Sequence, residues 1–192
     1  RKRLYEEIEK TFMLYSQEVL VEEFIEGREL TVGILGNENP TVLPILEVDF
    51  TNCRESGEFF YSWRMKEYQG DESLHLVPEF FCPARLEEDT TKVVKEIALK
   101  AYRALGCFDL SRVDIRLGYD NIPYVLEINP LPGLDPDESN LTFMTNAANI
   151  PYRDLINGIL RNAQERLKLK GQLSQKGESK IVTGEFPAYR AL

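Results

Sequence analysis

Apolar residues recur at helical spacing in two segments of the chain. In residues 3–15 and 87–105 they stand three or four positions apart, which predicts an amphipathic helix in each. In the second helix, Asp89 or Thr90 can cap the first turn, and Gly106 stops the last. Two further helices are expected closer to the end of the chain, at residues 140–148 and 152–168.

Three segments in the first quarter of the chain predict strands that follow one another as an antiparallel meander. They cover residues 18–27, 28–36 and 41–50. Pro44 indicates an edge position or a bulge, because proline has no N–H to donate to a neighbouring strand. Residues 51–83 show no clear pattern. The alternation of sheet and helix indicates an α+β fold rather than a doubly wound parallel sheet.

The most informative segment is DIRLGYDNIPYVLEINPLPG, residues 114–133. Its middle, GYDNIP, carries the Gly, Asp, Asn and Pro that are typical of a tight turn. The flanking stretches alternate apolar and polar residues, so they predict the two strands of a hairpin. If the turn centres on residues 120–121, four polar residues lie opposite one another in pairs and face the same side: Arg112, Asp114, Glu127 and Asn129.

In this register Asp114 lies opposite Glu127, and two facing carboxylates repel each other unless a cation lies between them. The cation could be a divalent metal ion, or it could be the side chain of Arg112 or Arg116. Together with the amide oxygen of Asn129, the two carboxylates suit Mg²⁺, which prefers oxygen ligands and shares its sites with waters and phosphates. The alternative is a half-exposed hairpin with one solvated face and no ligand.

Composition narrows the classes of protein to consider. The chain has 192 residues, enough for one large domain or two small ones, and its 23 basic and 32 acidic residues give a formal charge of −9. Such an acidic chain lacks the basic surface of a nucleic-acid-binding protein.

The three cysteines are widely spaced, which indicates a reducing cytoplasm rather than a zinc site or disulfide framework. No apolar run suggests a membrane partner. The chain begins without Met, so we expect a fragment.

Four motifs, spread from about Val19 to Leu167, together resemble the D-alanine–D-alanine ligase family of the ATP-grasp superfamily. They are VLVEEFIEGRELTVGILG, ALKAYRALGC, SRVDIRL and YVLEINPLPG, in that order. The resemblance implies an ATP-grasp fold with an antiparallel sheet and flanking helices. We expect residues 1–170 to form a partial ATP-grasp domain, followed by a polar tail at residues 171–192.

The resemblance also implies a nucleotide site for ATP. Glu22 would accept a hydrogen bond from the adenine amino group, and backbone groups around Phe24 and Ile25 would recognise the ring edge. Glu29 would bind the ribose hydroxyls, and Lys66 would contact the phosphates. Without the resemblance, these glutamates would be interpreted as a solvated strand edge.

The polar residues of the hairpin match the family as well. Asp114, Glu127 and Asn129 correspond to its metal ligands, for Mg²⁺ or Mn²⁺. Arg112 corresponds to a catalytic arginine that stabilises negative charge. The implied reaction activates a carboxylate as an acyl phosphate with ATP, after which an amine displaces phosphate to form an amide.

The substrate loop departs from the family pattern. It reads NPLPGLDPDESNL, in which Gly133 still matches but Ser139, the nearest candidate for the serine that binds the substrate carboxylate, is one residue out of register. The substrate would be D-alanine, or another amino acid or peptide; a thiol acceptor and a non-catalytic nucleotide-binding module are further alternatives. The family's N-terminal half and its glycine-rich phosphate loop are not recognisable, so we expect weak nucleotide binding and no turnover by this chain alone. The family suggests a cytoplasmic enzyme and a possible homodimer.

Overall fold

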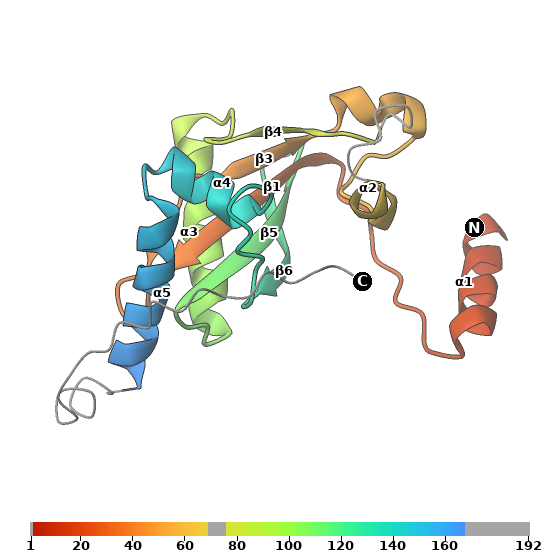
Figure 1. Ribbon diagram of the computed structural model, residues 1–192. Coiled ribbons are helices and arrows are strands. Elements are labelled where there is room, and N and C mark those ends of the chain that lie inside the picture. Colours follow the sequence, from red (N-terminus) through yellow and green to blue (C-terminus); the bar gives the residue numbers. More distant parts are fainter. Residues whose placement is uncertain (1, 69–75, 168–192) are drawn as a thin grey trace.

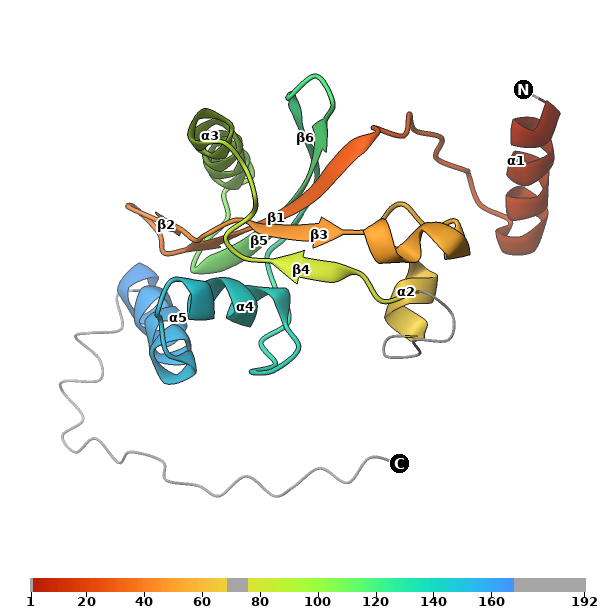
Figure 2. The same ribbon diagram turned by 90° about the horizontal axis from the view of Figure 1, so that it is seen from above.

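The computed structural model describes residues 2–68 and 76–167, except for the side chains of Trp63 and Lys66. One antiparallel sheet forms the centre, with helices on both of its faces (Figures 1 and 2). The elements in chain order are α1 (Lys2–Tyr15), β1 (Gly27–Leu35), β2 (Thr41–Val42), β3 (Leu46–Asp49), the 3-10 helix η1 (Thr51–Ser56), α2 (Trp63–Glu67), β4 (Glu79–Phe81), α3 (Glu88–Ala104), β5 (Leu110–Gly118), β6 (Pro123–Asn129), α4 (Asn140–Ala147) and α5 (Tyr152–Arg166).

The sheet has the strand order β4-β3-β1-β5-β6, and the short β2 also pairs with β1. Every pairing is antiparallel, and the two longest strands, β1 and β5, pair over their whole length. Figure 2 shows α3 on one face of the sheet and α4 and α5 on the other. The predicted α+β class and antiparallel sheet with flanking helices are therefore confirmed.

Alternate residues of the two central strands form the core beneath α3. Leu30, Val32 and Ile34 of β1 are fully buried there, and so are Val113 and Ile115 of β5. Because successive side chains of a strand point to opposite faces, the residues between them face α4 and α5. On β5 these intervening residues include charged ones, so this face of the sheet carries the polar site as well as apolar packing.

Gly33 of β1 lets α4 lie close to the sheet. A Cβ atom added there would lie 2.7 Å from Leu43 Cδ1 and 2.8 Å from Leu141 Cδ1, and both leucines are buried. We therefore expect Gly33→Ala to lower the free energy of unfolding by about 1–3 kcal/mol, because the core must be overpacked. Urea denaturation would measure the change. The matched control is Gly158→Ala on α5, where a Cβ meets nothing within 4 Å; equal destabilisation of both variants would contradict the close-packing argument.

Several predicted boundaries differ from the structure. Residues 18–27 are not a strand: residues 17–26 are irregular, and within the described parts of the chain no strand pairs with them. The predicted strand 41–50 is split into β2 and β3, with Pro44 in the break, as its lack of an N–H suggested. The N-cap of α3 is Glu87 rather than Asp89 or Thr90, and it makes no capping hydrogen bond through its side chain.

The remaining predicted helices are confirmed within a few residues of their expected ends. In both ribbon views α1 stands apart from the sheet and is joined to β1 by the irregular segment (Figures 1 and 2). No helix in the described ranges 2–68 and 76–167 is long and apolar enough to cross a membrane. The predicted tail, residues 171–192, lies outside the described residues.

Candidate nucleotide and metal site

The hairpin of β5 and β6 has the predicted register at its polar end. Asp114 is the partner of Glu127, and Arg112 is the partner of Asn129. After Asp114 the register shifts at a bulge, so that Ile115 is the partner of Val125 and not of Leu126. Leu126, which alternation places on the core face, is instead 55% exposed and lines a cavity on the opposite side.

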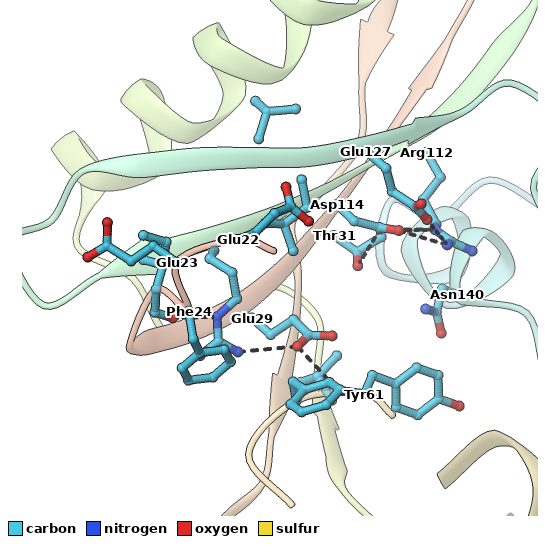
Figure 3. Close-up of a pocket in the computed structure, with 16 residues that line it drawn as sticks. Glu22, Glu23, Phe24, Glu29, Thr31, Tyr61, Arg112, Asp114, Glu127 and Asn140 are labelled. Atoms are coloured by element: carbon cyan, nitrogen blue, oxygen red, sulfur yellow. Dashed lines mark hydrogen bonds and ion pairs between the residues drawn. The ribbon is translucent and has the colours of Figure 1, made fainter. Parts of the chain in front are cut away.

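This cavity, of about 580 Å³, lies over the charged face of the central strands. Its floor contains two cross-strand pairs between β1 and β5, Glu29 with Arg116 and Thr31 with Asp114. Figure 3 shows Glu22, Glu23 and Phe24 at one end, Arg112, Glu127 and Asn140 at the other, and Glu29 and Asp114 between them. The structure thus places most of the predicted site residues around one cavity: Glu22, Phe24, Ile25, Glu29, Arg112, Asp114 and Glu127.

At one end of the cavity, Arg112 holds the carboxylate of Asp114 with two nitrogen atoms. Its Nη2 lies 2.7 Å from Asp114 Oδ2, and its Nε lies 3.0 Å from Oδ1. The same Nη2 lies 3.9 Å from Glu127 Oε1, and the hydroxyl of Thr31 donates to Asp114 at 3.0 Å. Burial acts to lower the pKa of Arg112, but the hydrogen bond to Asp114 and the negative charges of Asp114 and Glu127 together raise it. Of the two candidate arginines, it is therefore Arg112 that lies beside the facing carboxylates.

The carboxylates of Asp114 and Glu127 fit a magnesium ion that keeps several waters or phosphates among its ligands. The described residues contain no cluster of three or more His, Cys, Asp or Glu side chains, so an all-protein cage is not present there. Mg²⁺ is usually bound by one or two carboxylates together with substrate phosphates, which matches this pair. Asn129 lies beside them in the register but does not line the cavity, and its Oδ1 accepts a hydrogen bond from the N–H of Leu131 at 2.9 Å.

Glu29, which lies in the floor of the cavity opposite Arg116, is largely enclosed. Burial raises its pKa above the ordinary 4.5, while the N–H of Tyr61 and the guanidinium of Arg116 act in the opposite direction. Tyr61 N lies 3.3 Å and Arg116 Nη1 lies 3.2 Å from Glu29 Oε2. Its second oxygen, Oε1, accepts no hydrogen bond from the residues that the structure describes, so a ligand hydroxyl could donate to it.

The predicted substrate loop after β6 is closed by its own hydrogen bonds. Ser139 donates from Oγ to the carbonyl oxygen of Gly133 at 2.6 Å, which brings together the two predicted substrate residues. Neither lines the cavity, but the next residue, Asn140, does. Sequence reasoning missed Asn140. The one-residue shift of Ser139 relative to the family pattern was a signal that a neighbouring residue could take its place at the site.

Lys66 and Tyr61 both belong to the segment around α2. The backbone of Lys66 lies in α2, but its side chain is not described, so the structure does not place the predicted phosphate contact. Tyr61, which sequence reasoning also missed, lines the cavity from the loop before α2. Its segment shows no pattern in the sequence, and only the folding of this loop against β1 brings it to the site.

Comparison with known proteins supports the resemblance seen in the motifs. Residues 1–161 match a family described as "D-ala D-ala ligase C-terminus". A D-alanine–D-alanine ligase from Desulforudis audaxviator is 39% identical over 148 residues, covering 77% of this chain and 44% of the relative. A solved D-alanine–D-alanine ligase from Bacillus anthracis has a TM-score of 0.67 at 28% identity, covering 89% of this chain and 51% of that one. A structure of such a ligase from the same organism, complexed with ATP, has a TM-score of 0.64 at 24% identity, covering 89% and 49%.

These matches confirm the expected ATP-grasp type of fold. They also show that the chain spans less than half the length of the curated relatives it matches.

Proposed function

Since this chain belongs to the D-alanine–D-alanine ligase C-terminal family, we propose that it carries the metal site and part of the ATP site of a ligase joining a carboxylate to an amine. The observation that carries the proposal is the single cavity that joins Glu22, Phe24 and Glu29 to the facing carboxylates of Asp114 and Glu127. A nucleotide has this layout of a base and ribose at one end and phosphates at the other. The distribution of residue types along the cavity follows the same order (Figure 3).

We assign the uncharged part of the nucleotide to the end of the cavity formed by residues 22–29. Glu22 accepts from the adenine amino group, and Glu29 accepts from the ribose hydroxyls. The carbonyl of Ile25 already accepts a hydrogen bond from Arg116, so the backbone group of Ile25 that remains for the ring edge is its N–H. One acceptor and one donor at this spacing match adenine, whose amino group and N1 have the complementary order. Lys66 is proposed to contact the phosphates.

We assign the phosphates and the metal to the end of the cavity formed by β5 and β6. Asp114 and Glu127 would hold Mg²⁺ or Mn²⁺, with Asn129 as a further ligand once its side chain turns from the loop. The bound ion would neutralise and align the phosphates during phosphoryl transfer. Without it, the carboxylates of this wall would repel a triphosphate, because Arg112 and Arg116 are both already paired with acids.

The proposed reaction has two steps. A substrate carboxylate oxygen bonds to the γ-phosphorus while the bond to ADP breaks, which gives an acyl phosphate. An amine nitrogen then bonds to the carbonyl carbon, phosphate leaves, and the nitrogen gives up a proton. Negative charge builds up on oxygen in both steps, and Arg112 is placed at the phosphate end of the cavity to stabilise it.

The substrates are proposed to be small amino acids or peptides, bound near Gly133, Ser139 and Asn140. Because the loop differs from the pattern for D-alanine, other amino acids and peptides are candidates alongside it. We further propose that residues 1–170 form one part of an ATP-grasp domain that is completed by the rest of the protein. Cytoplasmic localisation and assembly as a homodimer also remain predictions.

The test uses the full-length natural protein with Mg²⁺, ATP and hydroxylamine, which traps acyl phosphates as hydroxamates. Hydroxamate should form with an amino acid or peptide that supplies the carboxylate, and an amide of the expected mass should replace it when an amine is added. A thioester would identify a thiol acceptor instead. Binding of ATP with no carboxylate-dependent release of phosphate would overturn the proposal in favour of a non-catalytic nucleotide-binding module.

Affinity for adenosine is expected to fall as the pH is lowered through the pKa of Glu29, which lies above the ordinary value of 4.5. Ionised Glu29 accepts bonds from the ribose more strongly than the protonated acid does, and burial raises its pKa above 4.5, so this advantage is lost at a higher pH than for an exposed glutamate. Calorimetric titration between about pH 4 and 7 would measure the affinity. Adenosine has no phosphates, so the metal site does not contribute.

The control for this experiment is Glu29→Gln, which should bind adenosine more weakly and lose the part of the pH dependence that belongs to Glu29. If the variant and the wild type show the same pH profile, Glu29 does not contact the ribose.

A further inference from the structure

Arg116 is a buried arginine at the centre of the sheet, and neither the family motifs nor the proposed chemistry gives it a role. It lies on β5 in the floor of the cavity, and only 5% of its side chain is exposed. Removing a guanidinium from water costs free energy unless its N–H groups find acceptors. The acceptors that Arg116 finds therefore show what this residue holds together.

Its guanidinium binds three separate parts of the chain. Nε donates to the carbonyl of Ile25 at 3.0 Å, and Nη2 donates to the carbonyl of Gly27 at 3.3 Å. Nη1 lies 3.2 Å from Glu29 Oε2 and 3.3 Å from the carbonyl of Phe59. The same side chain thus connects the irregular segment, the start of β1 and the loop before α2.

The irregular segment depends on this connection because it has little else to hold it. Residues 17–26 belong to no helix or strand, and no backbone hydrogen bond of the described chain outside the regular elements involves them. Besides the bond to Ile25, Arg116 contacts the segment through the ring of Phe24, which lies 4.9 Å from its Cζ. Phe24 in turn contacts Phe60, with their ring centroids 6.1 Å apart. The irregular segment and the loop before α2 therefore also contact each other directly.

We propose that Arg116 is a positioning residue that fixes the base- and ribose-binding wall of the nucleotide site. It acts through Ile25, Glu29 and Phe59 rather than by touching the nucleotide. This inference rests on the proposed function, because it concerns the same cavity. It predicts that Arg116 governs nucleotide affinity, whereas metal binding by Asp114 and Glu127 does not depend on it.

The test compares Arg116→Met with Arg166→Met in the full-length natural protein. Arg166 is a matched control, since it also makes an ion pair, with Asp109, and also lies over an aromatic ring, Phe108, but it is on α5 and does not line the cavity. The affinity for ATP should fall about 10- to 100-fold in Arg116→Met, as for the loss of charged hydrogen bonds, and should not change in Arg166→Met. In steady-state kinetics the KM for ATP should rise while kcat at saturation is kept.

Two further measurements separate positioning from general stability. Hydrogen exchange of the ligand-free protein should become faster in residues 27–29 and 57–62 of Arg116→Met, but not along β6 or the first half of β5. Titration with Mn²⁺ alone should be unchanged. Because the exchange experiment needs no nucleotide, it still tests Arg116 if the wild type fails to bind ATP, a result that would overturn the proposed function instead.

Unchanged ATP affinity in Arg116→Met would overturn the inference, and so would faster exchange spread evenly over the chain. If Arg116→Met does not fold, Arg116→Lys tests the inference instead, because an ammonium keeps the charge but cannot reach all four acceptors at once. It should fold and bind ATP with an affinity below that of the wild type. Wild-type affinity in the lysine variant would show that charge alone is needed and that the guanidinium does not position the wall.

Discussion

Replacing Glu127 by glutamine is expected to lower the turnover of the full-length protein about 1,000-fold. A bound metal ion supplies several kcal/mol of stabilisation to a phosphoryl-transfer transition state, and each 1.4 kcal/mol is a factor of ten in rate. The substitution keeps the shape of the side chain and removes only its charge. Calorimetric titration with an ATP analogue, with and without Mg²⁺, should also show that metal-dependent binding is lost.

Glu127 is a better choice for this experiment than Asp114. Its side chain is 65% exposed on the edge strand β6, so the substitution disturbs little packing. Asp114 is bonded to both Arg112 and Thr31, and its replacement would change the floor of the cavity as well as the charge. The matched control is Glu96→Gln, an exposed glutamate on α3, on the opposite face of the sheet. Turnover close to that of the wild type in Glu127→Gln would place the metal elsewhere.

The hairpin that carries Glu127 could be predicted because its signals are local. Turn residues and period-two alternation fix which residues face each other, and the pairs formed by Asp114 and Arg112 agree with that prediction. The bulge could not be predicted, because apolar and polar residues still alternate on each side of the extra residue of β6. Its effect is specific: it turns Leu126 from the core into the cavity wall.

Contacts between distant segments could not be read from local patterns. The apolar residues of segment 18–27 predicted a strand, but a strand also requires a partner, and none of the described strands pairs with this segment. The bond between Glu29 and Arg116 joins residues 87 positions apart and depends on the pairing of β1 with β5. Asn140 reaches the cavity from α4, which packs closely on Gly33. In each case tertiary packing, and not propensity, makes the site.

Replacing Arg112 by methionine should separate the two roles of the charged end of the cavity. The guanidinium lies against Asp114 and within 3.9 Å of Glu127, so it neutralises the carboxylates that a metal ion needs. Removing it leaves two facing carboxylates with no cation between them, and their repulsion is relieved by a bound divalent ion. We therefore expect Arg112→Met to bind Mn²⁺ more tightly than the wild type does.

The same variant should turn over about 100- to 1,000-fold more slowly, because a preorganised donor to the developing negative charge is lost. Tighter metal binding with slower turnover distinguishes Arg112→Met from Glu127→Gln, in which both decrease. Arg112→Lys keeps the charge but not the bidentate hydrogen bond to Asp114, so it should fall between the wild type and Arg112→Met in both measurements. Weaker Mn²⁺ binding in Arg112→Met would contradict this account, since it would mean that Arg112 supports the geometry of the carboxylates and does not compete with the metal for them.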